Sequence, residues 1–299
     1  MNSETPKTSN SHKTEIFLGI LAALMLAVLI ATLALCLPYF GQEAQLLATT
    51  EAPTETTVPP TTEETAPPTE PTIPPDLNPL GRHDFQYNRN NFLLLTHGES
   101  SAGVDVSAFQ GNIDWQAVAD SGIEFAIIRL GYRGYGQKGT LVEDDYAKIN
   151  LEGAKAAGLD VGAYFFSQAL TVEEVEEEID FMLKTLGDTE LDMPIVFDWE
   201  YISDTARTAN MDANTLTWLS LQFCLTMEEK GYDPMVYFNW HQSSKLLYLH
   251  DLEAYPFWLA LYSDRMTYPY KVEMWQYTNK GRVPGIQGDV YINVYMPNP

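Results

Sequence analysis

Cysteine is scarce in this sequence, with only Cys36 and Cys224 among 299 residues. Cys36 lies in a long apolar run, and Cys224 lies in the helical pattern LTWLSLQFCLTMEEKG, so the two have no plausible way to pair. The five histidines are scattered, and no Cys/His group has the spacing of zinc ligands. The sequence therefore predicts a domain without disulfides that its core holds together, with no metal and no cofactor.

Basic residues are also few, with 17 Lys and Arg against 41 Asp and Glu and a formal net charge of -24. Nucleic-acid-binding proteins neutralise phosphates with clustered Lys and Arg, so this balance argues against nucleic acid. The first predicted strand–helix turn lacks a G-x-G-x-x-G motif, which argues against dinucleotide binding. Acidity alone identifies no partner, because it most often serves solubility.

One apolar run is long, and it covers residues 16–37 with the sequence IFLGILAALMLAVLIATLALCL. About 20 apolar residues span a bilayer as a helix, whereas the apolar region of a signal peptide has about 7–15. Lys7 and Lys13 precede the run, and the next basic residue is Arg82. By the positive-inside rule, this asymmetry places the N-terminus in the cytoplasm and the rest of the chain outside.

We therefore predict a cytoplasmic tail over 1–15, an uncleaved transmembrane signal anchor over 16–37, and a single-pass location in the cell membrane. A cleaved signal is the alternative. A lipoprotein box ending at Cys36 is disfavoured because Leu35 is large where a small residue is needed. Residues 38–80, rich in Thr, Pro and Glu, predict a disordered linker because they cannot bury enough apolar surface to offset the entropy of ordering.

After a transitional segment at 81–102, strand and helix patterns alternate from Gly103 to the C-terminus. The eight strand candidates cover 103–109, 125–132, 161–168, 193–200, 233–240, 256–262, 271–278 and 289–295. Most are continuously apolar, which suits parallel strands buried on both faces. Helical patterns separate the early strands but are short or missing later. We predict a (β/α)8-like TIM barrel over 103–299 with a degenerate second half; a doubly wound open sheet is the alternative.

Polar residues gather at the predicted strand ends, where a barrel has its active site. In MPIVFDWE, Asp198 and Glu200 are two positions apart and share one face of the strand. Neighbouring carboxylates raise each other's pKa, so one can stay protonated while the other is ionised, as glycoside hydrolysis requires. The alternative is that both acids cap the next helix or form an inert ion pair with Arg129.

Aromatic residues at the other strand ends favour a sugar ligand, because sugar rings stack on Trp and Tyr faces. The candidates are Tyr164, Tyr237, Trp258, Tyr262 and Trp275. Each aromatic alone is more often a core residue, so the argument depends on their convergence at one end of the barrel.

The motifs GVDVSAFQGNIDW, GAYFFS, PIVFDWE, WLALY and MWQYTNKGRVPGIQGDVYINVY together resemble glycoside hydrolase family 25, the Chalaropsis-type lysozymes or N-acetylmuramidases. The resemblance covers about Gly103 to Tyr295. It implies cleavage of the β-1,4 bond between N-acetylmuramic acid and N-acetylglucosamine in peptidoglycan. It also implies that Glu200 is the general acid, with Asp198 and Asp105 in the acidic cluster.

The resemblance leaves the mechanism open between two schemes. In one, the substrate's 2-acetamido group attacks the anomeric carbon while Asp198 orients it and Glu200 protonates the leaving oxygen. In the other, the product is inverted and Asp105 is a distant base. The remaining predicted substrate-binding residues are Arg129, Gln276, Asp289 and Tyr291.

One departure from the family pattern concerns the last strand, where VYIN stands in place of the common V-D-x-N, with Tyr291 at the acid's position. Asp289, two residues earlier, is expected to share its face and to substitute in part.

Two other functions stay open: a wall-binding protein without turnover, and a chitinase-like hexosaminidase. The expected partners are peptidoglycan strands and, through the anchor, the membrane. We expect a monomer.

Overall fold

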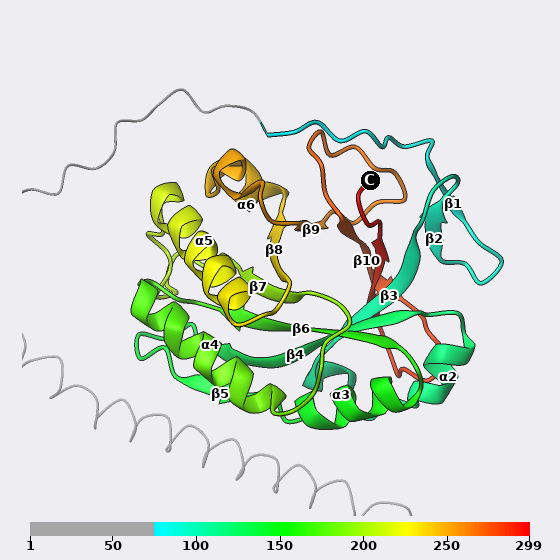
Figure 1. Cartoon of the computed structure of the whole chain (residues 1–299), viewed down its shortest axis with the longest axis horizontal. Coiled ribbons are helices and arrows are strands. Elements are labelled where there is room, and N and C mark those ends of the chain that lie inside the picture. Colours follow the sequence, from blue (N-terminus) through cyan, green and yellow to red (C-terminus); the bar gives the residue numbers. More distant parts are fainter. Residues whose placement is uncertain (1–74) are drawn as a thin grey trace, which may run out of the picture. The chain divides into compact units, whose positions relative to one another are not determined.

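The computed structural model describes residues 75–299, which form a closed eight-stranded barrel (Figure 1). Its strands are β3 (Ser101–Val106), β4 (Phe125–Arg133), β6 (Asp160–Ser167), β7 (Ile195–Trp199), β8 (Pro234–Asn239), β9 (Phe257–Ala260), β10 (Met274–Gly281) and β11 (Val290–Tyr295). Neighbours from β3 round to β10 are parallel. A ninth strand, β5 (Leu141–Glu143), pairs antiparallel with β4 outside the ring. The predicted barrel is confirmed, and the open sheet is excluded.

The last strand differs from a TIM barrel, because β11 is antiparallel to both β10 and β3. Only residues 282–289 connect β10 to β11, whereas a parallel crossover needs a dozen or more residues. The eighth strand therefore runs in the opposite direction. As a result its first residues, rather than its last, lie at the catalytic end of the barrel, and Tyr291 pairs with Asp105.

Helices cover the first half of the barrel, and loops cover most of the second half. The helices are α2 (Trp115–Asp120), α3 (Ala147–Ala156), α4 (Val172–Leu186), α5 (Ala213–Glu229) and α6 (Trp240–Lys245), with the 3-10 turns η2 (Ala108–Gln110) and η3 (Leu249–Leu252). The side chains of Asp114, Thr171 and Asp212 accept hydrogen bonds from backbone N–H groups and start α2, α4 and α5. In the described part of the chain, no helix lies between β9 and β10 or between β10 and β11, so the second half is degenerate as predicted.

The apolar residues form two layers on opposite faces of the strands. A large outer cluster lies between strands and helices. A smaller inner cluster fills the barrel and includes Phe125, Ile127, Val196, Met235 and Met274. Successive residues of a strand point to opposite faces, so the sequence position of one inner residue predicts the others.

A hairpin precedes the barrel in the predicted transitional segment and packs against it. It consists of β1 (Phe85–Tyr87) and β2 (Leu93–Leu95), paired antiparallel. The Phe85 ring meets the Trp275 ring edge-on at 5.1 Å between centroids. The N–H of Leu93 donates to the Tyr277 hydroxyl at 3.2 Å. The hairpin is thus part of the folded domain.

The predicted linker boundary at residue 80 differs from the structure. The carbonyl of Asp76 accepts from the N–H of Lys271, and the N–H of Asn78 donates to the carbonyl of Pro269, both at 2.9 Å. Residues 75–80 therefore begin the domain. The predicted tail, anchor and remaining linker lie outside the described residues. Among the helices of 75–299, none combines the length and apolarity needed to cross a membrane.

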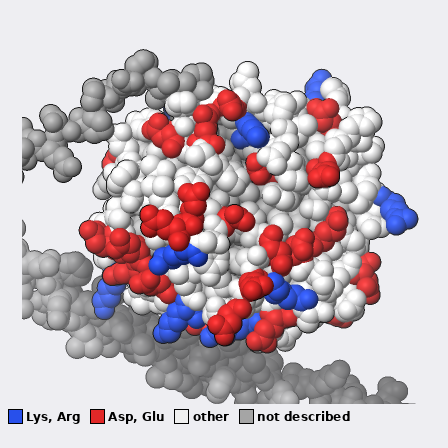
Figure 2. Space-filling view, viewed as in Figure 1, with Lys and Arg blue, Asp and Glu red and all other residues white. Residues whose placement is uncertain are grey.

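Acidic side chains dominate the molecular face shown in Figure 2, where Lys and Arg are few and separated. This distribution matches the net charge of -24 for the whole chain. Such a face repels polyanions.

A buried ion pair on the outside of the barrel predicts a stability effect. Arg133, at the end of β4, has a side chain 3% exposed, and its Nε lies 2.7 Å from Oε1 of Glu178, whose side chain is 1% exposed. We expect Arg133→Met to lower the free energy of unfolding by about 3–5 kcal/mol, because Glu178 would stay buried without its cation. Chemical denaturation at neutral pH measures this loss.

Arg282→Met is the matched control, since its side chain is 70% exposed and its ion pair with Asp289 lies at the surface. It should change the free energy of unfolding by less than about 1 kcal/mol. Equal effects of the two substitutions would contradict the role assigned to the buried pair.

Candidate active site

A cleft of about 190 Å³ opens at the C-terminal ends of the parallel strands. Asp198 and Glu200, at the end of β7, both line it, as their spacing predicts. The lining residues are Asp105, Ser107, Phe109, Gln110, Arg129, Tyr164, Phe166, Asp198, Glu200, Tyr237, Trp258, Tyr262, Gln276 and Tyr291. All eight barrel strands or their adjoining loops contribute to this lining, and acids and aromatic rings thus meet in one place.

Two predicted site residues lie elsewhere. Trp275 is fully buried on the outer face of β10, where its Nε1 donates to the carbonyl of Leu261 at 2.8 Å. Because Gln276 points into the barrel, its neighbour Trp275 must point out. A buried indole offers no face to a sugar, so Trp275 is a packing residue here.

Asp289 precedes β11 and lies at the surface, with its carboxylate 2.9 Å from Nζ of Lys280 and 2.8 Å from Nη2 of Arg282. The hydrogen bond from Lys280 lowers the pKa of Asp289. The expectation that Asp289 shares a face with Tyr291 and substitutes for an acid there is wrong, because Asp289 is engaged outside the cleft.

Three carboxyl groups lie in the cleft, and the pKa of each is raised. Burial, then the charges of Glu200 and Asp105, raise the pKa of Asp198 well above its usual value, and Arg129 opposes the shift. Burial and the charge of Asp105 raise the pKa of Glu200 to about 7. Near neutral pH the cluster therefore retains a proton, which supplies an acid beside an ionised carboxylate.

The carboxylate of Asp105 is buried but accepts hydrogen bonds from two side-chain amides. Nε2 of Gln276 and Nδ2 of Asn293 each lie 2.8 Å from its Oδ2. Burial raises the pKa of Asp105 to about 6 although both hydrogen bonds oppose the shift. At neutral pH these donors favour the ionised form.

Asn293 is not among the predicted site residues, yet its side chain connects Asp105 to Trp258. It donates to Asp105 and accepts from Nε1 of Trp258 at 2.9 Å, which sets the orientation of its amide. The signal was its position two residues after Tyr291, on the same strand face. The sequence prediction also omitted Phe109, which is 86% exposed at the cleft rim with the Arg129 guanidinium 5.1 Å from its ring centroid.

The inert alternatives for the acid pair do not hold. Nε of Arg129 lies 2.7 Å from Oδ2 of Asp144 and makes its ion pair there. Within residues 75–299, no Lys or Arg nitrogen lies within 4.0 Å of a carboxylate oxygen of Asp198 or Glu200. The helix that follows them is capped by Asp212. In addition, Oδ1 of Asp198 is buried with no hydrogen-bond partner among the described residues, so one acceptor is left for a substrate.

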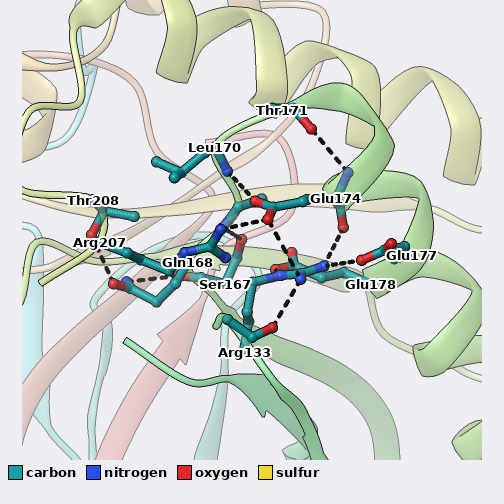
Figure 3. A network of polar contacts seen from close by, with 12 residues as sticks. Arg133, Ser167, Gln168, Leu170, Thr171, Glu174, Glu177, Glu178, Arg207 and Thr208 are labelled. Carbon is teal, nitrogen blue, oxygen red and sulfur yellow. Dashed lines mark hydrogen bonds and ion pairs between the residues drawn. The ribbon is translucent and has the colours of Figure 1, made fainter. Parts of the chain in front are cut away.

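The backbone of Glu200 is held by the buried side chain of Gln168, which belongs to a polar network with Thr208 (Figure 3). Nε2 of Gln168 donates to the Glu200 carbonyl at 2.7 Å, and Oε1 of Gln168 accepts from the Thr208 hydroxyl at 2.7 Å. The adjoining Arg207 forms an ion pair with Glu174 of α4. The loop after β7 is thereby attached to the neighbouring helix, and the acid's position is set by contacts far along the chain.

A closed barrel whose cleft combines a buried, perturbed acid pair with exposed aromatic rings defines a glycoside hydrolase. The family model "Glycosyl hydrolases family 25" matches residues 104–286. The chain therefore belongs to glycosyl hydrolases family 25, as its motifs indicated.

Relatives support this assignment. Escherichia coli YegX, an uncharacterized protein, is 29% identical over 209 residues, covering 64% of this chain and 68% of its own. Lysozyme M1 of Streptomyces globisporus is 27% identical over 203 residues, covering 64% and 67%. The solved structure of the autolysin LytC from Streptococcus pneumoniae, in complex with a synthetic peptidoglycan ligand, has a TM-score of 0.59 and 25% identity. The match covers 71% of this chain and half of LytC.

The raised pKa of Glu200 predicts that replacing this residue with Gln lowers activity and increases stability at neutral pH. Glu200→Gln should lower turnover by about 10²–10⁴, the usual contribution of one acid–base group. Ionising Glu200 costs more in the folded chain than in the unfolded chain, so wild-type stability falls as pH rises from about 4.5 to about 7. Gln has no charge to bury, so the stability of the variant relative to the wild type should increase as pH rises through that range.

Melting temperatures at pH 4 and pH 8, measured beside turnover, check both effects. Glu152→Gln, on the exposed side of α3, is the control and should change neither quantity. Turnover of Glu200→Gln within a few-fold of the wild type would contradict the assignment.

Tyr291 offers a test of charge in the cleft. It is 36% exposed, faces Asp105 across the strand pair, and its pKa is raised by burial and by the three cleft carboxylates. Tyr291→Asp would add a like charge and raise the pKa of Glu200, so the alkaline limb of the pH–rate profile should move to higher pH.

Tyr291→Asn, which removes the ring without adding charge, is the matched control for this shift. If the two variants have the same alkaline limb, or if Tyr291→Asp moves it down, the side chain acts through packing or sugar stacking instead.

Proposed function

We propose that this protein hydrolyses the β-1,4 bond between N-acetylmuramic acid and N-acetylglucosamine in peptidoglycan. The observation that carries the proposal is the buried pair Asp198 and Glu200 beside Asp105, in a cleft lined by aromatic rings and with no cation partner from residues 75–299. The names of the relatives support the substrate, since two curated relatives are lysozymes and LytC was solved with a peptidoglycan ligand.

The geometry favours help from the substrate's own 2-acetamido group. The unpartnered Oδ1 of Asp198 accepts the acetamide N–H, and the acetamide oxygen attacks the anomeric carbon. Glu200, whose pKa of about 7 leaves a large fraction of it protonated near neutrality, gives its proton to the leaving glycosidic oxygen. Glu200 then takes a proton from water as that water opens the cyclic intermediate, which regenerates the acid and retains the anomeric configuration.

The alternative is inversion with Asp105 as the base. Its Oδ2 already accepts two amide hydrogen bonds, which lowers its basicity and favours a role in charge stabilisation. NMR of the first-formed product distinguishes the two schemes, since the β-anomer indicates retention and the α-anomer indicates inversion.

We also propose that residues 16–37 anchor the protein in the cell membrane, with the barrel outside as a monomer on the organism's own wall. The support is the 22-residue apolar run, the basic residues before it, and the Thr-, Pro- and Glu-rich residues after it. A spacer of this length lets a membrane-bound enzyme reach glycan strands above the bilayer.

Mass spectrometry of fragments released from purified cell walls tests the activity. The wild type should release fragments with reducing muramic acid ends, and Glu200→Gln should release almost none. Reducing glucosamine ends would indicate a hexosaminidase. Wall binding without any release by the wild type would indicate a protein that kept the fold and lost turnover.

Proteolysis of wall-stripped cells tests the location. Added protease should release a soluble domain that begins before Asp76, because the backbone hydrogen bonds of residues 76–78 protect the chain from that point on. A cytoplasmic protein of known location is the control and should stay intact. An intact protein in the culture supernatant that begins soon after residue 40 would show that the apolar segment is cleaved.

A further inference from the structure

A second hollow, of about 480 Å³, lies beside the catalytic cleft. One side is the tip of the β1–β2 hairpin, residues 87 and 90–92, and the other is formed by β10, β11 and the loop after β9. Its volume is within the range of roughly 300–1,000 Å³ that is typical of ligand sites. The hairpin precedes residue 104, where the family match begins, so one wall of this hollow is supplied by residues outside the matched segment.

Tyr262 connects the two hollows, because it lines both. Its side chain is 50% exposed, and its hydroxyl donates to Oε1 of Gln276 at 3.0 Å. Gln276 in turn donates to Asp105. A polymer that occupies the cleft can therefore continue across Tyr262 into the second hollow without leaving the protein surface.

The hairpin wall is preformed. Oδ1 of Asn88 accepts from the N–H groups of Asn90 and Phe92 at 2.9 and 3.0 Å, and Asn91 has a positive φ of 64°. These contacts define the tip, and the bond from Leu93 to Tyr277 attaches it to the barrel. Little conformational entropy is then lost when a ligand binds between hairpin and barrel.

The chemistry of the lining suits sugar rings better than acidic peptides. Tyr87, 49% exposed, and Tyr262 offer ring faces, and Asn90 offers an amide. The two cations of the lining, Lys280 and Arg282, both contact Asp289. The acid Asp264 also lines the hollow. The hollow thus carries little excess positive charge with which to attract the carboxylates of stem peptides.

We propose that this second hollow is an accessory subsite that binds sugar units of the same glycan strand, beyond those that occupy the cleft. The inference rests on the proposed hydrolysis of peptidoglycan glycan strands. The subsite holds long strands at the cleft but is not reached by the shortest substrates, so it increases affinity for polymer without taking part in the chemistry.

Steady-state kinetics of the full-length protein in detergent tests the subsite with two substrates. One is a peptide-free glycan strand of many disaccharides, and the other is the tetrasaccharide of alternating N-acetylglucosamine and N-acetylmuramic acid. Tyr87→Ala should raise KM for the strand by about 3–10-fold, the value of one aromatic contact, with kcat unchanged. For the tetrasaccharide, both constants should stay at their wild-type values.

Asn90→Ala tests the subsite independently of the Tyr87 ring, since the side-chain amide of Asn90 makes no hydrogen bond within residues 75–299. It should raise KM for the strand in the same direction. Tyr87→Phe, which keeps the ring, should behave as the wild type. Trp218→Ala is the control for loss of an exposed aromatic, since Trp218 is 52% exposed on α5 and lines neither hollow.

The outcomes separate this inference from the proposed function. Unchanged KM for the strand in both Tyr87→Ala and Asn90→Ala, or an equal rise for strand and tetrasaccharide, would overturn the accessory subsite while leaving the hydrolase intact. The same strand with its stem peptides attached serves as a third substrate. An increase in KM for this strand but not for the peptide-free strand would show that the ligand is peptide rather than sugar, and would also overturn the accessory subsite. No cleavage of either substrate by the wild type would instead refute the proposed function.

Discussion

The active end of this barrel depends on the burial of three carboxyl groups, Asp105, Asp198 and Glu200, at one mouth. Removing them from water raises the pKa of each, and the charge of Asp105 raises the pKa of Asp198 and Glu200 further. Burying these acids lowers the stability of the folded state, and the packed barrel and the amides that donate to Asp105 offset this loss. The same cost produces a group that holds a proton near neutral pH, which an exposed glutamate does not do.

The amide contacts explain how like charges coexist there. Gln276 and Asn293 come from β10 and β11, and both donate to Asp105. The buried Oδ1 of Asp198 receives no donor from residues 75–299, and Glu200 is held through its backbone carbonyl by Gln168. One carboxylate is thus solvated by the protein, whereas the other two keep oxygens for a substrate and for proton transfer.

The antiparallel direction of β11 determines which of its residues reach the three carboxyl groups. A parallel eighth strand would bring its C-terminal residues to the mouth. The short connection from β10 brings the start of β11 there instead, so that Tyr291 lies opposite Asp105 and Asn293 lies one step deeper. The hairpin that packs on β10 then extends the surface beside the cleft, from residues that precede the barrel in the sequence.

The barrel class, the helices of its first half and the acid pair can be predicted from the amino-acid sequence, because they follow from local rules. Alternation of side chains along a strand places Asp198 and Glu200 together, and cap residues mark the helix starts. The same rule could have shown that Trp275 and Gln276 point to opposite faces, and the connection length could have shown that β11 is antiparallel. The partners of the charged and amide side chains cannot be predicted in this way, because they come from separate elements. Arg129 pairs with Asp144, Asp289 pairs with Lys280 and Arg282, and the Asn293 amide donates to Asp105. The partners of a charged side chain depend on which elements lie within a few ångströms, and only the closed barrel sets those distances.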